Sequence, residues 1–240
     1  MSAPRPDPAT RHGRSVAAMF SAIAPTYDLL NHLLSLNTDR RWRDRAVRRL
    51  APRPGERFLD LCTGTGDLAL AVLARERGCA VVGADFSRPM LLRAARKAAR
   101  AGAPLPLVEA DALALPFRDG SFDGVAVAFG VRNFEELDRG LFEMARVLRL
   151  GGRVLLLEFS QPRGSLFGFL YRIYFTRGLP LVGRLVSRDA HAYRYLPATV
   201  QGFPPPPVLT CHLEAAGFGS VTHLPLTGGI ATLTEAVRIR

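Results

Sequence analysis

The stretch "FLDLCTGTGDLALAV", residues 58–72, passes from an apolar run through spaced glycines into a second apolar run. Gly64, Gly66 and Ala69 fit the G-x-G-x-x-G/A spacing of a nucleotide-binding turn, which joins a strand to a helix. Glycine lets the backbone approach a ligand closely, and a helix N-terminus offers unpaired N–H groups. The stretch therefore predicts a strand–turn–helix unit whose turn holds a nucleotide-bearing cofactor.

Strand and helix patterns alternate along the chain on either side of this turn. Such alternation is typical of βαβ units, and it predicts a parallel sheet with helices on both faces. A Gly228-Gly229 pair near the C-terminus indicates an antiparallel hairpin. We therefore expect an α/β fold with a doubly wound, mostly parallel seven-stranded sheet. The expected strands are 57–63, 80–86, 106–111, 122–130, 153–159 and two within 219–239, and the expected helices are 67–77, 88–100, 135–149 and 207–217.

A single domain is expected over residues 15–240, preceded by a loose proline-rich tail at 1–14. Helical patterns at 15–50, and irregular helices in an insertion at 161–200, are expected to cover a substrate. Within that insertion, residues 164–186 are apolar and aromatic but are interrupted by arginines and by Pro180. A membrane-spanning helix needs about 20 mostly apolar residues, so we expect contact with a membrane surface and not a span.

Composition limits the classes of partner and the compartment. The 240 residues carry a formal net charge of +11, and Lys97 is the only lysine. No block of five or six like charges resembles a nucleic-acid arm, so no nucleic-acid partner is expected. The three cysteines have no metal-type pairing, so no metal site is predicted. Sparse cysteines, and an N-terminus without a signal-peptide core, favour the reducing cytoplasm.

Three carboxylates are expected near the glycine turn. Asp60 lies inside the first strand, where a buried carboxylate is costly unless it is paired, so we expect it to brace the turn. Asp85 ends the second strand, 21 residues after Gly64, where an acidic residue can accept hydrogen bonds from ribose hydroxyls. Asp111-Ala112 ends the third strand, where a carboxylate can meet an adenine amine. The glycine turn and Asp85 suit NAD and S-adenosylmethionine alike, whereas Asp60, Asp111-Ala112 and a Gly151-Gly152 pair just before the expected strand at 153–159 separate the two and resemble the class I methyltransferases.

Several longer motifs make the chain similar to one group of enzymes. From about residue 15 to 231 it resembles the ubiquinone/menaquinone biosynthesis C-methyltransferase family, whose fold is that of the class I methyltransferases. The most specific of these motifs are "IAPTYDLLN" and "FGVRN", and the others are "RRWR", "DLCTGTGD", "DFSRPML", "ALPFRDGSFD", "RVLRLGGRVLLLEFSQP", "YRYL" and "LTGGI".

The resemblance implies an S-adenosylmethionine-dependent enzyme that methylates a ring carbon of a prenylated quinol, with demethylmenaquinol as the first expectation and a benzoquinol precursor of ubiquinone as the alternative. Arg132 and Asn133 are implied for the quinol, Arg132 as a fixed cation that stabilises a phenolate. Asp67, Tyr27 and Asp28 are candidates for the base. The implied cofactor residues are Asp60, Gly64, Thr65, Gly66, Asp85, Asp111, Ala112 and Ala128.

Other interpretations stay open at this point. An NAD-dependent oxidoreductase fits the glycine spacing alone, and a methyltransferase-like binding protein without chemistry would keep the same turn. Arg132 and Asn133 could merely cap the next helix, because asparagine is a good cap. Cys62 lies in the turn, but a nucleophilic cysteine needs an activating partner, so packing is the simpler interpretation. A homodimer also stays open.

Overall fold

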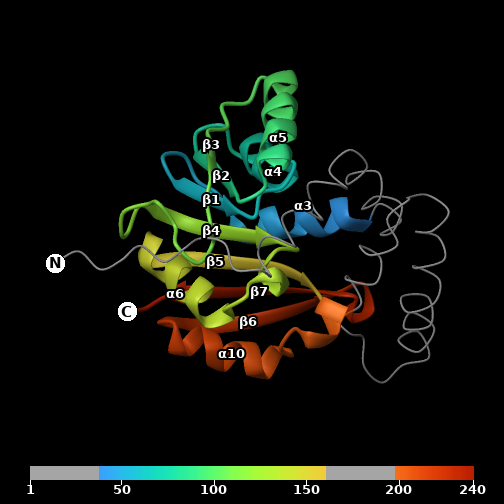
Figure 1. Ribbon diagram of the computed structural model, residues 1–240, viewed down its shortest axis with the longest axis vertical. Coiled ribbons are helices and arrows are strands. Elements are labelled where there is room, and N and C mark those ends of the chain that lie inside the picture. The colour runs from blue at the N-terminus through green and yellow to red at the C-terminus, as the bar shows by residue number, and fades with distance from the viewer. Residues whose placement is uncertain (1–37, 161–197) are drawn as a thin grey trace.

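The computed structural model describes residues 38–160 and 198–240, and residues 1–37 and 161–197 lie outside the described part. Helices and strands alternate over the described residues, as the sequence predicts (Figure 1). In chain order the elements are α3 (Thr38–Leu50), β1 (Arg57–Leu61), α4 (Asp67–Arg75), β2 (Ala80–Asp85), α5 (Arg88–Ala101), β3 (Leu107–Glu109), β4 (Phe122–Ala128), the 3-10 turn η1 (Val131–Asn133), α6 (Leu137–Val147), β5 (Leu148–Phe159), α10 (Pro206–Ala215), β6 (Phe218–Leu226), the 3-10 turn η3 (Thr227–Gly229) and β7 (Ala231–Arg238).

The strands form one seven-stranded sheet in the order β3-β2-β1-β4-β5-β7-β6. β1 to β5 pair in parallel, while β7 runs antiparallel to both β5 and β6. The predicted seven-stranded, mostly parallel sheet with its C-terminal hairpin is therefore confirmed. Chain order reverses between β1 and β4, and ligands of open parallel sheets bind outside the carboxyl ends of strands at such a point.

Both faces of the sheet are buried, which explains why its strands are nearly continuous apolar runs. Side chains alternate along each strand: Leu155 and Leu157 pack on the face of α3 and α4, and Val154 and Leu156 on the face of α6 and α10. On the first face lie Trp42, Ala46, Leu50, Leu68 and Val72, and on the second Leu141, Met144, Leu209 and Leu213.

The boundary between α6 and β5 differs from the prediction. The helix was expected to continue to residue 149 and the strand to begin at 153, but α6 ends at Val147 and β5 begins at Leu148. Leu148 pairs with Phe122, and the register then shifts before Gly124 pairs with Arg153. Gly151 supplies the positive φ of 73° in this irregular start, and both Gly151 and Gly152 therefore lie inside the strand.

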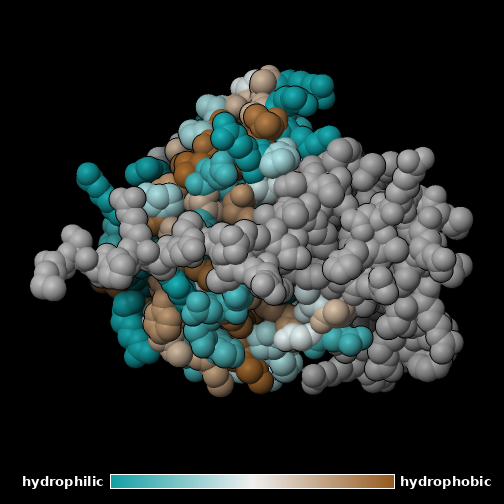
Figure 2. All heavy atoms as spheres, viewed as in Figure 1, coloured by the Kyte–Doolittle hydropathy of each residue, from teal (hydrophilic) through white to brown (hydrophobic). Residues whose placement is uncertain are grey.

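On the face seen in Figure 2, the described residues form a mixed surface in which apolar groups lie between hydrophilic ones. None of the helices within 38–160 and 198–240 combines the length and apolar character needed to cross a bilayer. The large apolar side chains that are exposed in this part are dispersed over several elements: Leu92, Phe142, Leu150, Val208 and Ile239.

Candidate active site

The turn between β1 and α4 is built on backbone that favours glycine. Gly64 and Gly66 have φ values of 56° and 84°, and Cys62 also has a positive φ, of 57°. Gly66 packs closely against α5, because a Cβ at this position would lie 3.2 Å from the Cβ of Ala94. The turn is closed by the Gly66 N–H, which donates to the Thr63 carbonyl at 2.8 Å. The G-x-G-x-x-A spacing thus produces the expected strand–turn–helix unit.

Asp60 braces this turn from inside the sheet. Its side chain is buried, and Oδ2 accepts hydrogen bonds from the Thr63 hydroxyl at 2.6 Å and from the Ala69 N–H at 3.0 Å. Burial raises the pKa of Asp60 to about 7, although these two hydrogen bonds oppose the rise. The contacts expected from a buried carboxylate in the first strand are therefore present.

Asp85 links the second strand to the same turn. One carboxylate oxygen accepts the Gly64 N–H at 2.8 Å, and the other accepts the Ser87 N–H at 2.8 Å. Burial raises the pKa of Asp85 despite these bonds. Gly64 and Asp85, which are 21 residues apart in the sequence, are therefore in direct contact where β1 and β2 end.

Asp111 and Ala112 follow the third strand at the neighbouring position. The Ala110 N–H donates to the Asp85 carbonyl at 3.0 Å, which brings this segment beside the end of β2. Asp111 Oδ1 accepts the Leu113 N–H at 2.9 Å and so shapes its own turn. The carboxyl ends of β1, β2 and β3 thus present the predicted acidic residues side by side.

Lys97, which sequence reasoning did not assign to the site, fixes the far side of the turn. From α5 its Nζ donates to the Thr65 hydroxyl at 3.0 Å and to Asp67 Oδ1 at 2.7 Å. Asp67 also lies 3.8 Å from Arg43 Nη2, and Arg43 Nη1 bonds Asp39 at 2.6 Å. The carboxylate of Asp67, predicted as a base, is thus held between two cations.

A crevice lies over the carboxyl ends of β1 and β4, at the reversal of strand order. Its floor and walls include Cys62 and Phe129, and burial raises the pKa of the Cys62 thiol well above its usual range. That direction opposes a nucleophilic thiolate and agrees with packing. Of the predicted site residues, the crevice is lined by Asp60, Gly64, Thr65, Asp67 and Ala128.

Arg132 and Asn133 lie in the turn η1 directly after β4. Helix α6 begins later, with Glu136 at its N-cap position, so the alternative that these two residues cap it is wrong. The Arg132 guanidinium is buried: Nη1 donates to the Phe129 carbonyl at 2.5 Å and to Glu158 Oε1 at 2.6 Å. The sequence suggested a fixed cation, and the structure pairs that cation with a carboxylate of β5 that the sequence did not indicate.

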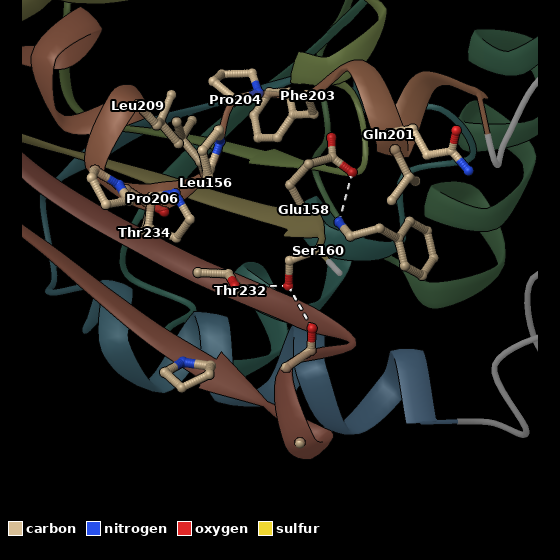
Figure 3. A pocket seen from close by; sticks show the side chains of 17 residues that line it. Leu156, Glu158, Ser160, Gln201, Phe203, Pro204, Pro206, Leu209, Thr232 and Thr234 are labelled. Carbon is tan, nitrogen blue, oxygen red and sulfur yellow. Dashed lines mark hydrogen bonds between the residues drawn. The ribbon is translucent and has the colours of Figure 1, made fainter. Parts of the chain in front are cut away.

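Glu158 also lines a cavity of about 760 Å³ between β5, β7 and the start of α10. Figure 3 shows that its lining is mixed, with polar side chains such as Glu158, Ser160 and Thr232 and apolar ones such as Phe203 and Pro204. Ser160 Oγ lies 2.8 Å from Thr232 Oγ1. Glu158, which lies in an apolar strand, was not identified from the sequence. A single carboxylate within an apolar run was, however, the same pattern that identified Asp60.

Comparison with known proteins assigns the chain to a family. Residues 9–238 match the model of the ubiE/COQ5 methyltransferase family. The chain belongs to this family. One family relative, "Demethylmenaquinone methyltransferase" of Thermus thermophilus, is 53% identical over 215 residues, which are 90% of this chain and 97% of that protein. A "Ubiquinone/menaquinone biosynthesis C-methyltransferase UbiE" of Geotalea uraniireducens is 43% identical over 93% of this chain and 96% of its own.

Solved structures show the same fold at low sequence identity. A methyltransferase of Thermotoga maritima, described as S-adenosylmethionine-dependent and as a possible histamine N-methyltransferase, has a TM-score of 0.64 at 16% identity, over 92% of this chain and 98% of that one. The phosphoethanolamine N-methyltransferase 2 of Haemonchus contortus has a TM-score of 0.63 at 17% identity, over 82% and 52%. Membership of the ubiE/COQ5 family excludes the NAD-dependent oxidoreductase that the glycine spacing alone left open.

Some predicted features of the site lie outside the described residues. These are Tyr27, Asp28 and the segment 164–186. Over residues 38–160 and 198–240, no cluster of three or more His, Cys, Asp or Glu side chains is arranged to hold a metal ion.

Proposed function

We propose that this chain is an S-adenosylmethionine-dependent C-methyltransferase that methylates a ring carbon of demethylmenaquinol and so forms menaquinol. The observation that carries the proposal is the 53% identity, over 97% of its length, to a relative named demethylmenaquinone methyltransferase. A benzoquinol precursor of ubiquinone is the second candidate substrate. It is favoured by relatives that are named for both quinones, at 43% to 45% identity.

The described residues fit the proposed cofactor. The backbone of Gly64–Gly66 would lie close to the cofactor, and Asp85, which accepts the Gly64 N–H, would also accept hydrogen bonds from ribose hydroxyls. Asp111 and Ala112 would border the adenine, and Asp60, Thr65 and Ala128 would enclose the amino-acid portion. When bound, S-adenosylmethionine supplies a methyl group on a sulfonium sulfur.

The chain's own part in the reaction would be to prepare the quinol ring. A ring carbon becomes a stronger nucleophile when the neighbouring hydroxyl loses its proton, and a phenol titrates near pH 10. Arg132 would stabilise the developing negative charge on that oxygen through hydrogen bonds in a water-poor site, and Asn133 would help to orient the ring. A guanidinium stays protonated at neutral pH, so Arg132 is not the base.

The candidates for the base differ in their surroundings. Asp67 is engaged by Lys97 and Arg43, so it would have to act from within an ion pair. Tyr27 and Asp28 remain candidates from the family resemblance. A contact of residues 164–186 with a membrane surface belongs to the same proposal, because a prenylated quinol is a lipid. Loss of vesicle binding on deletion of 164–178 would support that contact.

The experiment that tests the proposal has two parts. Calorimetric titration should show binding of S-adenosylmethionine and no comparable binding of NADH. Transfer of a labelled methyl group should then be measured on short-chain analogues of demethylmenaquinol and of the benzoquinol. Methylation of the naphthoquinol supports the first substrate, and methylation of the benzoquinol alone supports the second. Binding of NADH without a response to the methyl donor would contradict the proposal.

A further inference from the structure

Arg132 and Glu158 form a buried ion pair at the carboxyl ends of two adjacent strands. Their side chains are 6% and 4% exposed, and Nη1 lies 2.6 Å from Oε1. Glu158 also accepts the backbone N–H of Arg132 at 3.3 Å and that of Phe159 at 2.9 Å. The guanidinium carbon lies 5.5 Å from the centre of the Phe159 ring. The carboxylate therefore determines both where Arg132 lies and how its plane is turned.

One nitrogen of this guanidinium, Nε, has no hydrogen-bond partner among the described residues. The Nη1 corner is occupied by the Phe129 carbonyl and by Glu158, whereas Nε is buried and donates to no acceptor in the described part of the chain. A buried donor without an acceptor costs free energy, and such groups are rare in folded proteins. A guanidinium presents paired N–H groups along its Nε edge in a fork that matches an oxyanion. A ligand oxygen would satisfy Nε.

We propose that Glu158 is a positioning residue, which holds Arg132 so that the Nε edge meets the reacting oxygen of the quinol. The inference rests on the proposed function. The same carboxylate balances the guanidinium charge, because a site for a sulfonium cofactor would otherwise bring two cations into a poorly solvated space. The Arg132 guanidinium donates to the carbonyl of Phe129, which lines the crevice together with Cys62, so the pair lies beside the cofactor crevice.

The chain contains a similar pair that serves as a control. Arg153, in the middle of β5, bonds Glu56 at 2.6 Å and 2.9 Å, and its guanidinium carbon lies 5.1 Å from the centre of the Phe58 ring. This pair has the same chemistry but is placed at the edge opposite the crevice. The Arg153–Glu56 pair is less buried, at 26% and 13% exposed, so the two pairs are compared by turnover and not by stability. A purely structural role predicts that Glu56→Gln and Glu158→Gln both leave turnover unchanged, whereas a positioning role predicts a loss of turnover in Glu158→Gln alone.

The test measures turnover, cofactor affinity and stability on the same full-length proteins. Glu158→Gln should lower kcat/KM for the quinol by about 100-fold, the effect of losing one oriented transition-state donor. Its dissociation constant for S-adenosylmethionine should stay within about twofold of the wild-type value, and Glu56→Gln should keep kcat/KM within about twofold. Glu158→Asp retains the charge but has a shorter reach, so it should also lose about 100-fold. Glu158→Asp is measured in place of Glu158→Gln if Glu158→Gln does not fold.

The double variant that combines Arg132→Ala with Glu158→Gln tests whether Glu158 acts through Arg132. If it does, adding Glu158→Gln to Arg132→Ala should lower kcat/KM no further, because residues that act as a unit are not additive. The inference is overturned if the two losses multiply, or if Glu158→Gln loses only thermal stability and keeps its turnover. A wild-type enzyme that methylates neither quinol would contradict the proposed function and the inference together.

Discussion

The pKa of Asp60 leads to a prediction about stability that does not depend on catalysis. Burial raises the pKa of Asp60 to about 7 in the folded chain, against 3.8 for an ordinary aspartate. The folded state therefore binds the proton more tightly than the unfolded state. The stabilisation from this proton is complete below about pH 4 and is lost as the pH rises through about 7.

The replacement Asp60→Asn removes this dependence while keeping an acceptor oxygen for the Thr63 hydroxyl and the Ala69 N–H. From the two pKa values, wild-type protein should lose about 3 kcal/mol of this contribution between pH 4.5 and pH 8, and the variant should lose none. The other titratable groups are the same in the two proteins, so most of their contribution cancels in the difference between the two free energies of unfolding. The pH dependence of that difference reports Asp60 together with its coulombic coupling to Asp85.

Urea unfolding of both proteins at several pH values between 4.5 and 8 measures this difference. The stability of the variant relative to wild type should rise by about 3 kcal/mol over the range, with equal denaturant slopes. A difference that stays constant with pH would refute the argument, because Asp60 would then be ionised throughout.

Two further substitutions test how the glycine turn is held. Lys97→Met should weaken binding of S-adenosylmethionine about tenfold, because Thr65 and Asp67 lose the ammonium group that holds them, while Lys97→Arg should retain most of the affinity. The free energy of unfolding of Lys97→Met should fall by less than about 1 kcal/mol, because both side chains of the Lys97–Asp67 ion pair are 28% exposed. Calorimetry and urea unfolding measure the two effects, and unchanged affinity in Lys97→Met would contradict the clamp. Gly66→Ala should cost about 1–3 kcal/mol from its φ of 84° together with the close Ala94 contact. Gly102→Ala is the control, because it has a φ of 59° and open space around it, and an equal loss in both variants would show that the Ala94 contact does not matter.

Local patterns were sufficient for the architecture. Alternating apolar strands and helices indicated the doubly wound sheet, and the positions of Gly64, Gly66 and Asp85 indicated the crevice. The end of α6 was less predictable, because the change to β5 at Leu148 is set by pairing with Phe122, which lies 26 residues earlier in the chain. A single sequence does not display such a pairing.

The residues that were missed act across long sequence separations. Lys97 contacts Asp67 from 30 residues away, and Glu158 contacts Arg132 from 26 residues away. No residue near Lys97 or Glu158 in the sequence indicates which distant residue either of them contacts. An isolated glutamate in an apolar strand is the kind of position where a buried, paired carboxylate is expected, but Glu158 was not identified from the sequence, and only the fold shows that an arginine is its partner.

The central claim is that this chain transfers a methyl group to carbon on a quinol ring. It is tested most directly by incubating the wild-type enzyme with demethylmenaquinol and S-adenosylmethionine that carries a carbon-13 methyl group, and by locating the label in the product by NMR. The account predicts a single labelled methyl on the ring carbon beside a hydroxyl. A label on oxygen, or no transfer from a donor that binds, would contradict it.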